Sequence, residues 1–160
     1  MKLSRCNVCP LYKNREGIAF PKGTKPSNVL MIFGTYPKND FLVDREQEFI
    51  RQLQYYLKYD WYKTYAIKCK VKNKVKVDNI KSCRIWLKKE IKMVSPHLVV
   101  LMGKIPVVSI FGKKYHNLKQ NIFYEKKGRK YFVGESIEGN QNKIDDNLDT
   151  LLSYIRRYYS

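Results

Sequence analysis

VLMIFG at residues 29–34 and HLVVLMG at residues 97–103 decide the fold of this chain. Each is a short apolar run that ends in glycine, which is typical of a strand buried in a parallel sheet with a loop at its carboxyl end. The spacing of apolar residues elsewhere predicts strands at 64–71 and 129–136 and helices at 44–59, 79–93, 105–112 and 145–159.

Strands and helices alternate along this chain of 160 residues, so the expected fold class is α/β, with a parallel sheet covered by helices on both faces. The length suits a single domain over residues 1–160. Such sheets bind ligands where their strands end, and we therefore expect the functional site near residues 34–41 and 134–140. Residues 1–28 lack periodicity, which predicts an irregular arm that something other than a core face holds in place.

Positive charge dominates the composition, with 32 Lys and Arg against 14 Asp and Glu and a formal net charge of +18. Because 44% of the residues are hydrophobic, the chain can bury a core, and the charge belongs to a folded surface. Residues 58–92 hold twelve of the basic residues beside three acidic ones, which favours a nucleic-acid partner. The candidate nucleic-acid-binding residues are Lys68, Lys70, Lys72, Lys74, Lys76, Lys81 and Arg84.

Tyrosines are interleaved with this basic stretch, and their rings can stack on unpaired bases. The combination favours DNA that is single-stranded or forms a primer–template junction. RNA stays open as a ligand, as does the alternative that the Lys-rich faces are merely solvated.

The amino terminus, MKLSRCNVCP, has no apolar segment of the kind that a secretory signal needs. No run of about 18 apolar residues occurs in the sequence either. We therefore expect a cytoplasmic protein with no membrane partner. Because the cytosol keeps thiols reduced, its cysteines are better explained as metal ligands than as disulfides.

Four cysteines form the candidate metal site: Cys6 and Cys9 in a C-x2-C pair, Cys69 and Cys83. A zinc ribbon usually repeats the C-x2-C knuckle, whereas the second pair here is widely spaced. This spacing favours a 4Fe–4S cluster, whose larger cage accepts ligands from separate elements. Zinc is the alternative, and a chance C-x2-C with two buried structural cysteines is the third possibility. Either metal would hold the arm over residues 1–28 in place.

Five stretches follow the order of the parts of one known family: RCNVCPL at 5–11, GTYP at 34–37, IKC at 67–69, SCRIWLKKEI at 82–91 and SPHLVVLMG at 95–103. They resemble the family 4 uracil-DNA glycosylases, and the resemblance spans nearly the whole chain. It implies a three-layer uracil-DNA glycosylase-like fold, with a four-stranded parallel sheet between helices. It also implies a 4Fe–4S cluster on the four cysteines.

The resemblance locates the catalytic positions of the family, and several carry different residues here. Thr35 stands in place of a water-positioning Glu, and Tyr65 in place of the Asn that reads the uracil edge. VGESIEGN at 133–140 lacks the His of the second catalytic loop. Asp40 is the remaining candidate for a catalytic acid. The base-pocket residues that the resemblance implies are Thr35, Tyr36, Phe41 and Tyr65.

These departures affect the activation of water, the reading of the base and the stabilisation of the leaving base. The first hypothesis is therefore a DNA-binding, catalytically degenerate scaffold that acts as a non-enzymatic accessory subunit of a DNA polymerase or primase in replication. This role resembles that of a poxvirus glycosylase of the same superfamily, which looks to have been recruited as part of a polymerase processivity factor. The alternative is an active DNA glycosylase that excises uracil or another damaged base. A zinc protein that binds RNA is the third hypothesis.

Overall fold

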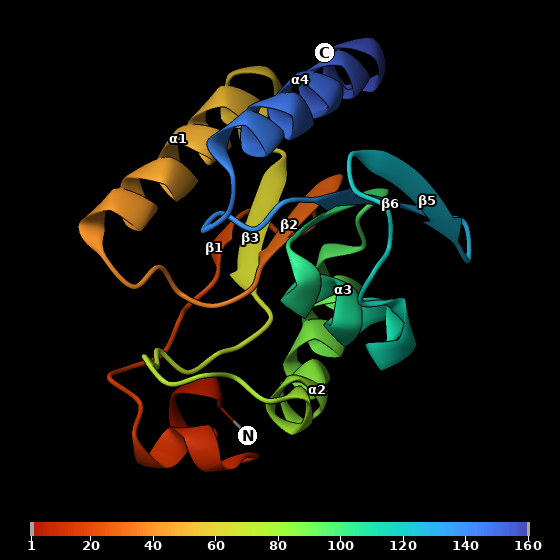
Figure 1. Cartoon of the computed structure of the whole chain (residues 1–160). Helices are drawn as coiled ribbons and strands as arrows, with labels where there is room; N and C mark the ends of the chain where they lie inside the picture. The colour runs from red at the N-terminus through yellow and green to blue at the C-terminus, as the bar shows by residue number, and fades with distance from the viewer. Residues whose placement is uncertain (1, 160) are drawn as a thin grey trace.

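The computed structural model of this chain describes residues 2–159, and one sheet of six strands lies at its centre (Figure 1). The strands lie in the order β1-β3-β2-β4-β6-β5. Their bounds are Lys22–Gly23, Val29–Phe33, Trp61–Tyr65, Leu98–Met102, Ile122–Lys126 and Arg129–Gly134 for β1 to β6. The central strands pair in parallel, while β1 and β5 pair antiparallel at the two edges. The sheet is thus mixed and six-stranded, which corrects the expected sheet of four parallel strands.

The two edge strands give little signal in the sequence. β1 is two residues long, which is too short to show a period. β5 joins β6 through a tight turn at Lys127 and Gly128, whose φ angles are 52° and 76°. Such turns usually carry Asn-Gly or Asp-Gly, so the Lys-Gly pair here does not predict a hairpin.

Helices cover both faces of the sheet and complete three layers (Figure 1). Their bounds are Asp40–Leu57 for α1, Val77–Val94 for α2, Lys104–Phe111 for α3 and Gln141–Tyr158 for α4. A hydrophobic core lies on each face of the sheet, and alternate residues of β2 pack into the two cores. Met31 and Phe33 pack toward α1 and α4. Leu30 and Ile32 pack toward α2 and α3. The predicted α/β class is confirmed. None of the helices in residues 2–159 is long and apolar enough to cross a membrane.

The strand predicted at 64–71 is found earlier in the chain, as β3 over Trp61–Tyr65. The chain then leaves the sheet and runs beside the arm, where the Ala19 amide donates to the Lys68 carbonyl at 2.8 Å. Ile18 and Cys69 form an isolated bridge at the same place. The strand-like alternation of residues 66–71 therefore reflects pairing with the arm.

The arm itself contains two short 3-10 turns, Leu3–Arg5 and Pro10–Lys13. It lies at the end of the molecule where β3 delivers its loop and where α2 begins (Figure 1). Three segments that are far apart in the sequence thus meet at this end.

Candidate functional site

A cavity of about 270 Å³ lies at the carboxyl ends of β2 and β4. These strands are neighbours in the sheet although β3 lies between them in the sequence, so the cavity marks the point where the strand order reverses. Open α/β sheets bind ligands at such points because the loops diverge there. Residues 34–35 line the cavity from one side and residues 135–138 from the other. We call it the switch-point cavity, and both loops expected from the sequence contribute to it.

The structure separates the expected base-pocket residues. Thr35 lines the switch-point cavity, and the rings of Tyr36 and Tyr65 pack together with their centroids 5.6 Å apart. Asp40 and Phe41 are exposed on the first turn of α1 and do not line the cavity. The reason is that α1 begins at residue 40, earlier than predicted, with Asn39 as its cap. The structure therefore does not bring Asp40 or Phe41 into this site.

Tyr65 fills the interior at the carboxyl end of β3. Its ring is 2% exposed and contacts Phe33 and Tyr36, and its hydroxyl donates to the Glu46 carboxylate on α1. Burial, reinforced by the charge of Glu46, raises the pKa of the Tyr65 phenol above its usual range. The side chain at this position is therefore a neutral, packed phenol at physiological pH.

Sequence reasoning did not single out three charged residues of the switch-point cavity, Lys104, Glu135 and Glu138. The Glu135 carboxylate accepts from the Ser136 amide at 3.0 Å. Gly103 lets the turn after β4 pass close to this loop, because an added Cβ would lie 3.1 Å from the Cβ of Ser136, and its φ is 103°. This glycine at the end of an apolar run is the one signal in the sequence that pointed to the close approach.

All four cysteines are buried and carry free thiols. Burial raises the pKa of Cys83 to about 11, the amide of Lys68 opposes the rise, and the thiols of Cys9, Cys69 and Cys6 reinforce it. Hydrogen bonds bring the segments of these cysteines together, because Arg15 reaches Cys6 and Cys69, and Trp86 on the helix of Cys83 reaches Cys6. Within residues 2–159, no three His, Cys, Asp or Glu side chains stand in an arrangement ready for a single metal ion.

Side-chain nitrogen donors lie beside two of these thiols, Cys6 and Cys69. Trp86 Nε1 donates to Cys6 Sγ at 3.2 Å, and Arg15 Nη1 lies 3.7 Å from Cys69 Sγ. The same Arg15 nitrogen donates to the Cys6 carbonyl at 2.7 Å. N–H donors beside sulfur stabilise thiolates and tune metal–sulfur centres. N–H donors of this kind are compatible with a 4Fe–4S cluster at these cysteines, and the presence of a cluster or of zinc stays a prediction.

The family model of the uracil DNA glycosylase superfamily matches residues 12–153 of the chain. This chain belongs to the uracil DNA glycosylase superfamily. The matched span runs from the arm to α4 and so includes the switch-point cavity. A comparison with individual curated proteins finds no match.

In this superfamily member, the basic residues expected to contact nucleic acid are not equally accessible. Lys68 is wholly buried, and its ammonium bonds to Thr64 and Glu90 in the interior. A phosphate contact by Lys68 is therefore ruled out, because the loop after β3 turns this side chain inward. The exposed members of the set are Lys72, Lys74, Lys76 and Lys81, which we call the basic face.

Arg84 is also engaged within the protein, because its Nε donates to the Ser109 carbonyl at 2.7 Å and joins α2 to α3. Two of its nitrogens are thus engaged within the protein, and a phosphate contact by Arg84 stays a prediction. Lys70 is half-buried, with its Nζ 4.0 Å from the centroid of the Tyr36 ring. The segment that carries the basic face thus begins directly beside the expected base pocket.

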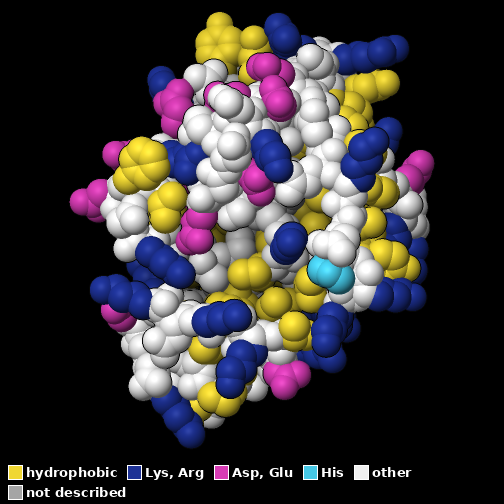
Figure 2. Space-filling view, viewed as in Figure 1, with side chains coloured by type: hydrophobic (Ala, Val, Ile, Leu, Met, Phe, Trp, Pro, Cys, Tyr) yellow, Lys and Arg dark blue, Asp and Glu magenta, His cyan; other side chains and the backbone are white. Residues whose placement is uncertain are grey.

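Charge is divided between the two helical layers of this superfamily member. In Figure 2, acidic side chains gather over α1 and α4, whereas the part formed by the arm and α2 shows mostly Lys and Arg. α1 carries four acidic and two basic residues, while α2 carries two acidic and five basic residues. A polyanion is therefore attracted to the α2 side of the molecule.

Proposed function

We propose that this protein is a DNA-binding, non-enzymatic accessory to a DNA polymerase or primase, built on a glycosylase scaffold whose catalytic groups have been replaced. It would hold a single strand or primer–template junction on the basic face and so keep its partner enzyme on the template.

The packing of Tyr65 carries this proposal. A glycosylase needs room for an extruded base and a group that reads the edge of that base. Tyr65 is packed between Phe33 and Tyr36, and its hydroxyl is bonded to Glu46. It therefore leaves no room for an extruded base and has no free group to read the edge of a base. Thr35 adds a hydroxyl where the family has a carboxylate, which weakens the activation of water.

The accessible charge supports binding without base excision. Four exposed lysines of the basic face are close in sequence, three of them in the loop before α2 and Lys81 on its first turns. Lysine contacts to phosphate give affinity that does not depend on sequence and that falls with salt. A tether for a replication enzyme needs this kind of binding, because it must work at every template position.

We assign a 4Fe–4S cluster to Cys6, Cys9, Cys69 and Cys83, with zinc as the alternative. The burial of all four thiols and the N–H donors from Arg15 and Trp86 support this assignment. When bound, the group would cross-link the arm, the loop after β3 and α2. The lysines of the basic face lie between Cys69 and Cys83, so the cysteines would also fix this face.

The function is tested with a uracil-containing single strand, in a base-release assay run beside a binding titration at two salt concentrations. We expect no release of uracil. Four phosphate contacts predict an affinity that falls about 50-fold for a fourfold rise in salt. The matched strand with thymine in place of uracil should bind equally well. Release of uracil would contradict the proposal, and so would an affinity that does not change with salt concentration.

The partner is tested by affinity capture with the tagged full chain from a nuclease-treated lysate of its own source. Recovery of a DNA polymerase or primase supports the accessory role. A capture that yields no replication protein counts against it, whatever the outcome of the DNA titration.

Glu135 favours a second candidate, an active glycosylase for uracil or another damaged base. Its carboxylate lines the switch-point cavity, where a general base could activate water. This candidate predicts release from a panel of uracil, hypoxanthine, xanthine and alkylated substrates. Glu135→Gln should then abolish release, and Asp40→Asn, on the exposed turn of α1, should not. No release from any substrate excludes it.

A further inference from the structure

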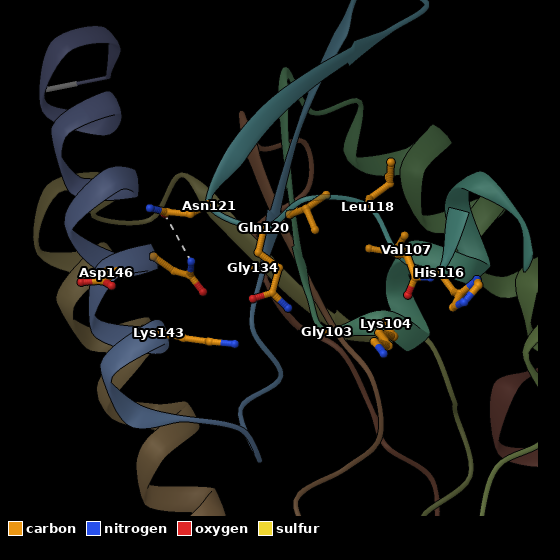
Figure 3. A pocket seen from close by; sticks show the side chains of 13 residues that line it. Gly103, Lys104, Val107, His116, Leu118, Gln120, Asn121, Gly134, Lys143 and Asp146 are labelled. Atoms are coloured by element: carbon orange, nitrogen blue, oxygen red, sulfur yellow. Dashed lines mark hydrogen bonds between the residues drawn. The ribbon is translucent and has the colours of Figure 1, made fainter. Parts of the chain in front are cut away.

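A second cavity, of about 450 Å³, adjoins the switch-point cavity and shares Gly103 and Lys104 with it (Figure 3). It lies at the carboxyl ends of β4 and β6, between residues 116–121 and the first turns of α4. The catalytic candidates Asp40 and Glu135 do not line it, although Val133 and Gly134 come from the stretch of the second catalytic loop. Its volume is in the range of pockets that hold small ligands.

Asn147 fixes the frame of this second cavity. Its side chain is buried, its Oδ1 accepts from the Glu135 amide at 2.7 Å, and its Nδ2 donates to Asn121 Oδ1 at 3.3 Å (dashed line in Figure 3). Gly134 allows this close packing, because a Cβ there would lie 3.0 Å from Asn147 Oδ1. One buried carboxamide therefore joins α4, β6 and the segment before β5. The walls of the cavity are held in place without a ligand.

Two lysines bring positive charge to the cavity. Lys104 begins α3, and Lys143 reaches from α4 toward the space in front of Gly103 and Lys104 (Figure 3). Neither ammonium is ion-paired with any residue in the described part of the chain. Among the described residues that line the cavity, Asp146 is the one acid. Lysine binds phosphate as a compact positive charge, so the pair suits one phosphate group.

The remaining lining groups match a nucleoside. Val107, Leu118 and Val133 give an apolar floor for a base and its sugar. Asn117 and Gln120 add carboxamides, each of which presents a donor beside an acceptor. Paired donors and acceptors are what the edge of a base requires.

We propose that this second cavity binds a nucleotide, with its phosphate between Lys104 and Lys143 and its base on the apolar floor beside Asn117 and Gln120. The same chemistry is presented by a free nucleotide and by the phosphorylated end of a DNA strand. Such a site goes beyond the accessory role, because nucleotide binding needs neither the basic face nor a partner enzyme.

The test is calorimetric titration of the full chain with the four deoxynucleoside monophosphates, the matching nucleosides and inorganic phosphate. At least one monophosphate should bind about tenfold or more tightly than its nucleoside or phosphate alone. Short strands with and without a 5′-phosphate form the second arm. A preference for the phosphorylated end also supports the proposal and identifies the strand end as the source.

Charge-matched variants locate the binding. Lys104→Ala and Lys143→Ala remove exposed side chains, so they should leave thermal unfolding unchanged and weaken the monophosphate about 5- to 10-fold each. Lys92→Ala is the control, because this exposed lysine lies near the end of α2, where the chain leads into the opposite end of β4. An equal loss in Lys92→Ala would show mere charge attraction and overturn the proposal.

Absence of saturable binding by every probe up to about 10 mM would also overturn it. Failure here is distinguishable from failure of the accessory role. Binding of the unphosphorylated strand depends on the basic face and should be the same in Lys143→Ala as in the parent protein.

Discussion

The Tyr65 hydroxyl donates a hydrogen bond to Glu46 and so joins the end of β3 to α1. Lys63 Nζ donates to the same Glu46 oxygen at 2.9 Å, which pairs a carboxylate that is only 2% exposed. The other oxygen, Oε2, has no hydrogen-bond partner among the described residues. Glu46 therefore depends on Tyr65 and Lys63, and the three side chains together hold the phenol in the expected base pocket.

Removal of the hydroxyl in Tyr65→Phe should destabilise the fold. The buried Glu46 carboxylate loses one of its two donors, so we expect the free energy of unfolding to fall by about 1–3 kcal/mol. Denaturant unfolding of the two proteins measures the difference. Tyr55→Phe is the control, because this ring is 78% exposed and its change should stay within about 0.5 kcal/mol. Equal effects of the two substitutions would contradict the role of Glu46.

Alkaline pH should destabilise the protein through its buried phenols. Burial raises the pKa of Tyr159 to about 12 and that of Tyr65 further, whereas unfolded tyrosines ionise near 10. Their contribution to stability is fully present below about pH 10 and is lost as the pH rises through the folded-state values. A buried phenol costs up to about 1.4 kcal/mol per pH unit in this window, and the more exposed Tyr159 costs less.

Denaturant unfolding between about pH 9 and pH 11 measures this loss. Tyr65→Phe removes one of the phenols, so its stability should fall less steeply with pH than that of the parent protein. Parallel curves for the two proteins would show that Tyr65 ionises normally in the folded state.

Single lysines of the basic face should contribute to DNA affinity through phosphate alone. Lys74→Ala and Lys81→Ala should each weaken single-strand binding about 2- to 5-fold and lower the slope of log affinity against log salt by about 0.7. Fluorescence anisotropy at several salt concentrations gives both values. Arg157→Ala, an exposed cation on α4 in the opposite layer, removes the same charge and should leave the slope unchanged. An equal drop of the salt slope in all three variants would mean that DNA binding is not confined to the basic face.

The cysteines should hold the arm in place. If the proposed 4Fe–4S cluster is bound, Cys69→Ala, purified anaerobically, should lose the iron and the visible absorption band of the parent protein. The amides of Glu16 and Lys70 should lose protection from hydrogen exchange, because their hydrogen bonds join the arm to the loop. Trp86→Phe is the comparison. It keeps all four thiols but removes the donor to Cys6, so the proposed cluster should stay and its reduction potential should shift. Full protection in Cys69→Ala would refute the structural role.

The main strands were predictable because burial on both faces leaves long apolar runs, as at residues 29–34 and 97–103. Side-chain direction outside the sheet was not predictable. Lys68 lies in a stretch where Lys alternates with other residues, a pattern that predicts solvent-exposed side chains. The loop after β3 nevertheless turns the Lys68 side chain toward Glu90. The frame of the second cavity was equally hidden, since Asn147 and Asn121 are 26 residues apart and an asparagine carries no periodic signal.

The division of charge between the helical layers gives the molecule an electric dipole across its sheet. The field of a polyanion exerts a torque on this dipole, which turns α2 toward the polyanion and α1 away from it before any contact is made. The first encounters would then already have the productive orientation, and low salt would speed association as well as strengthen binding. If the chain binds DNA as proposed, the acidic residues of α1 would favour binding in this way without a contact to the strand.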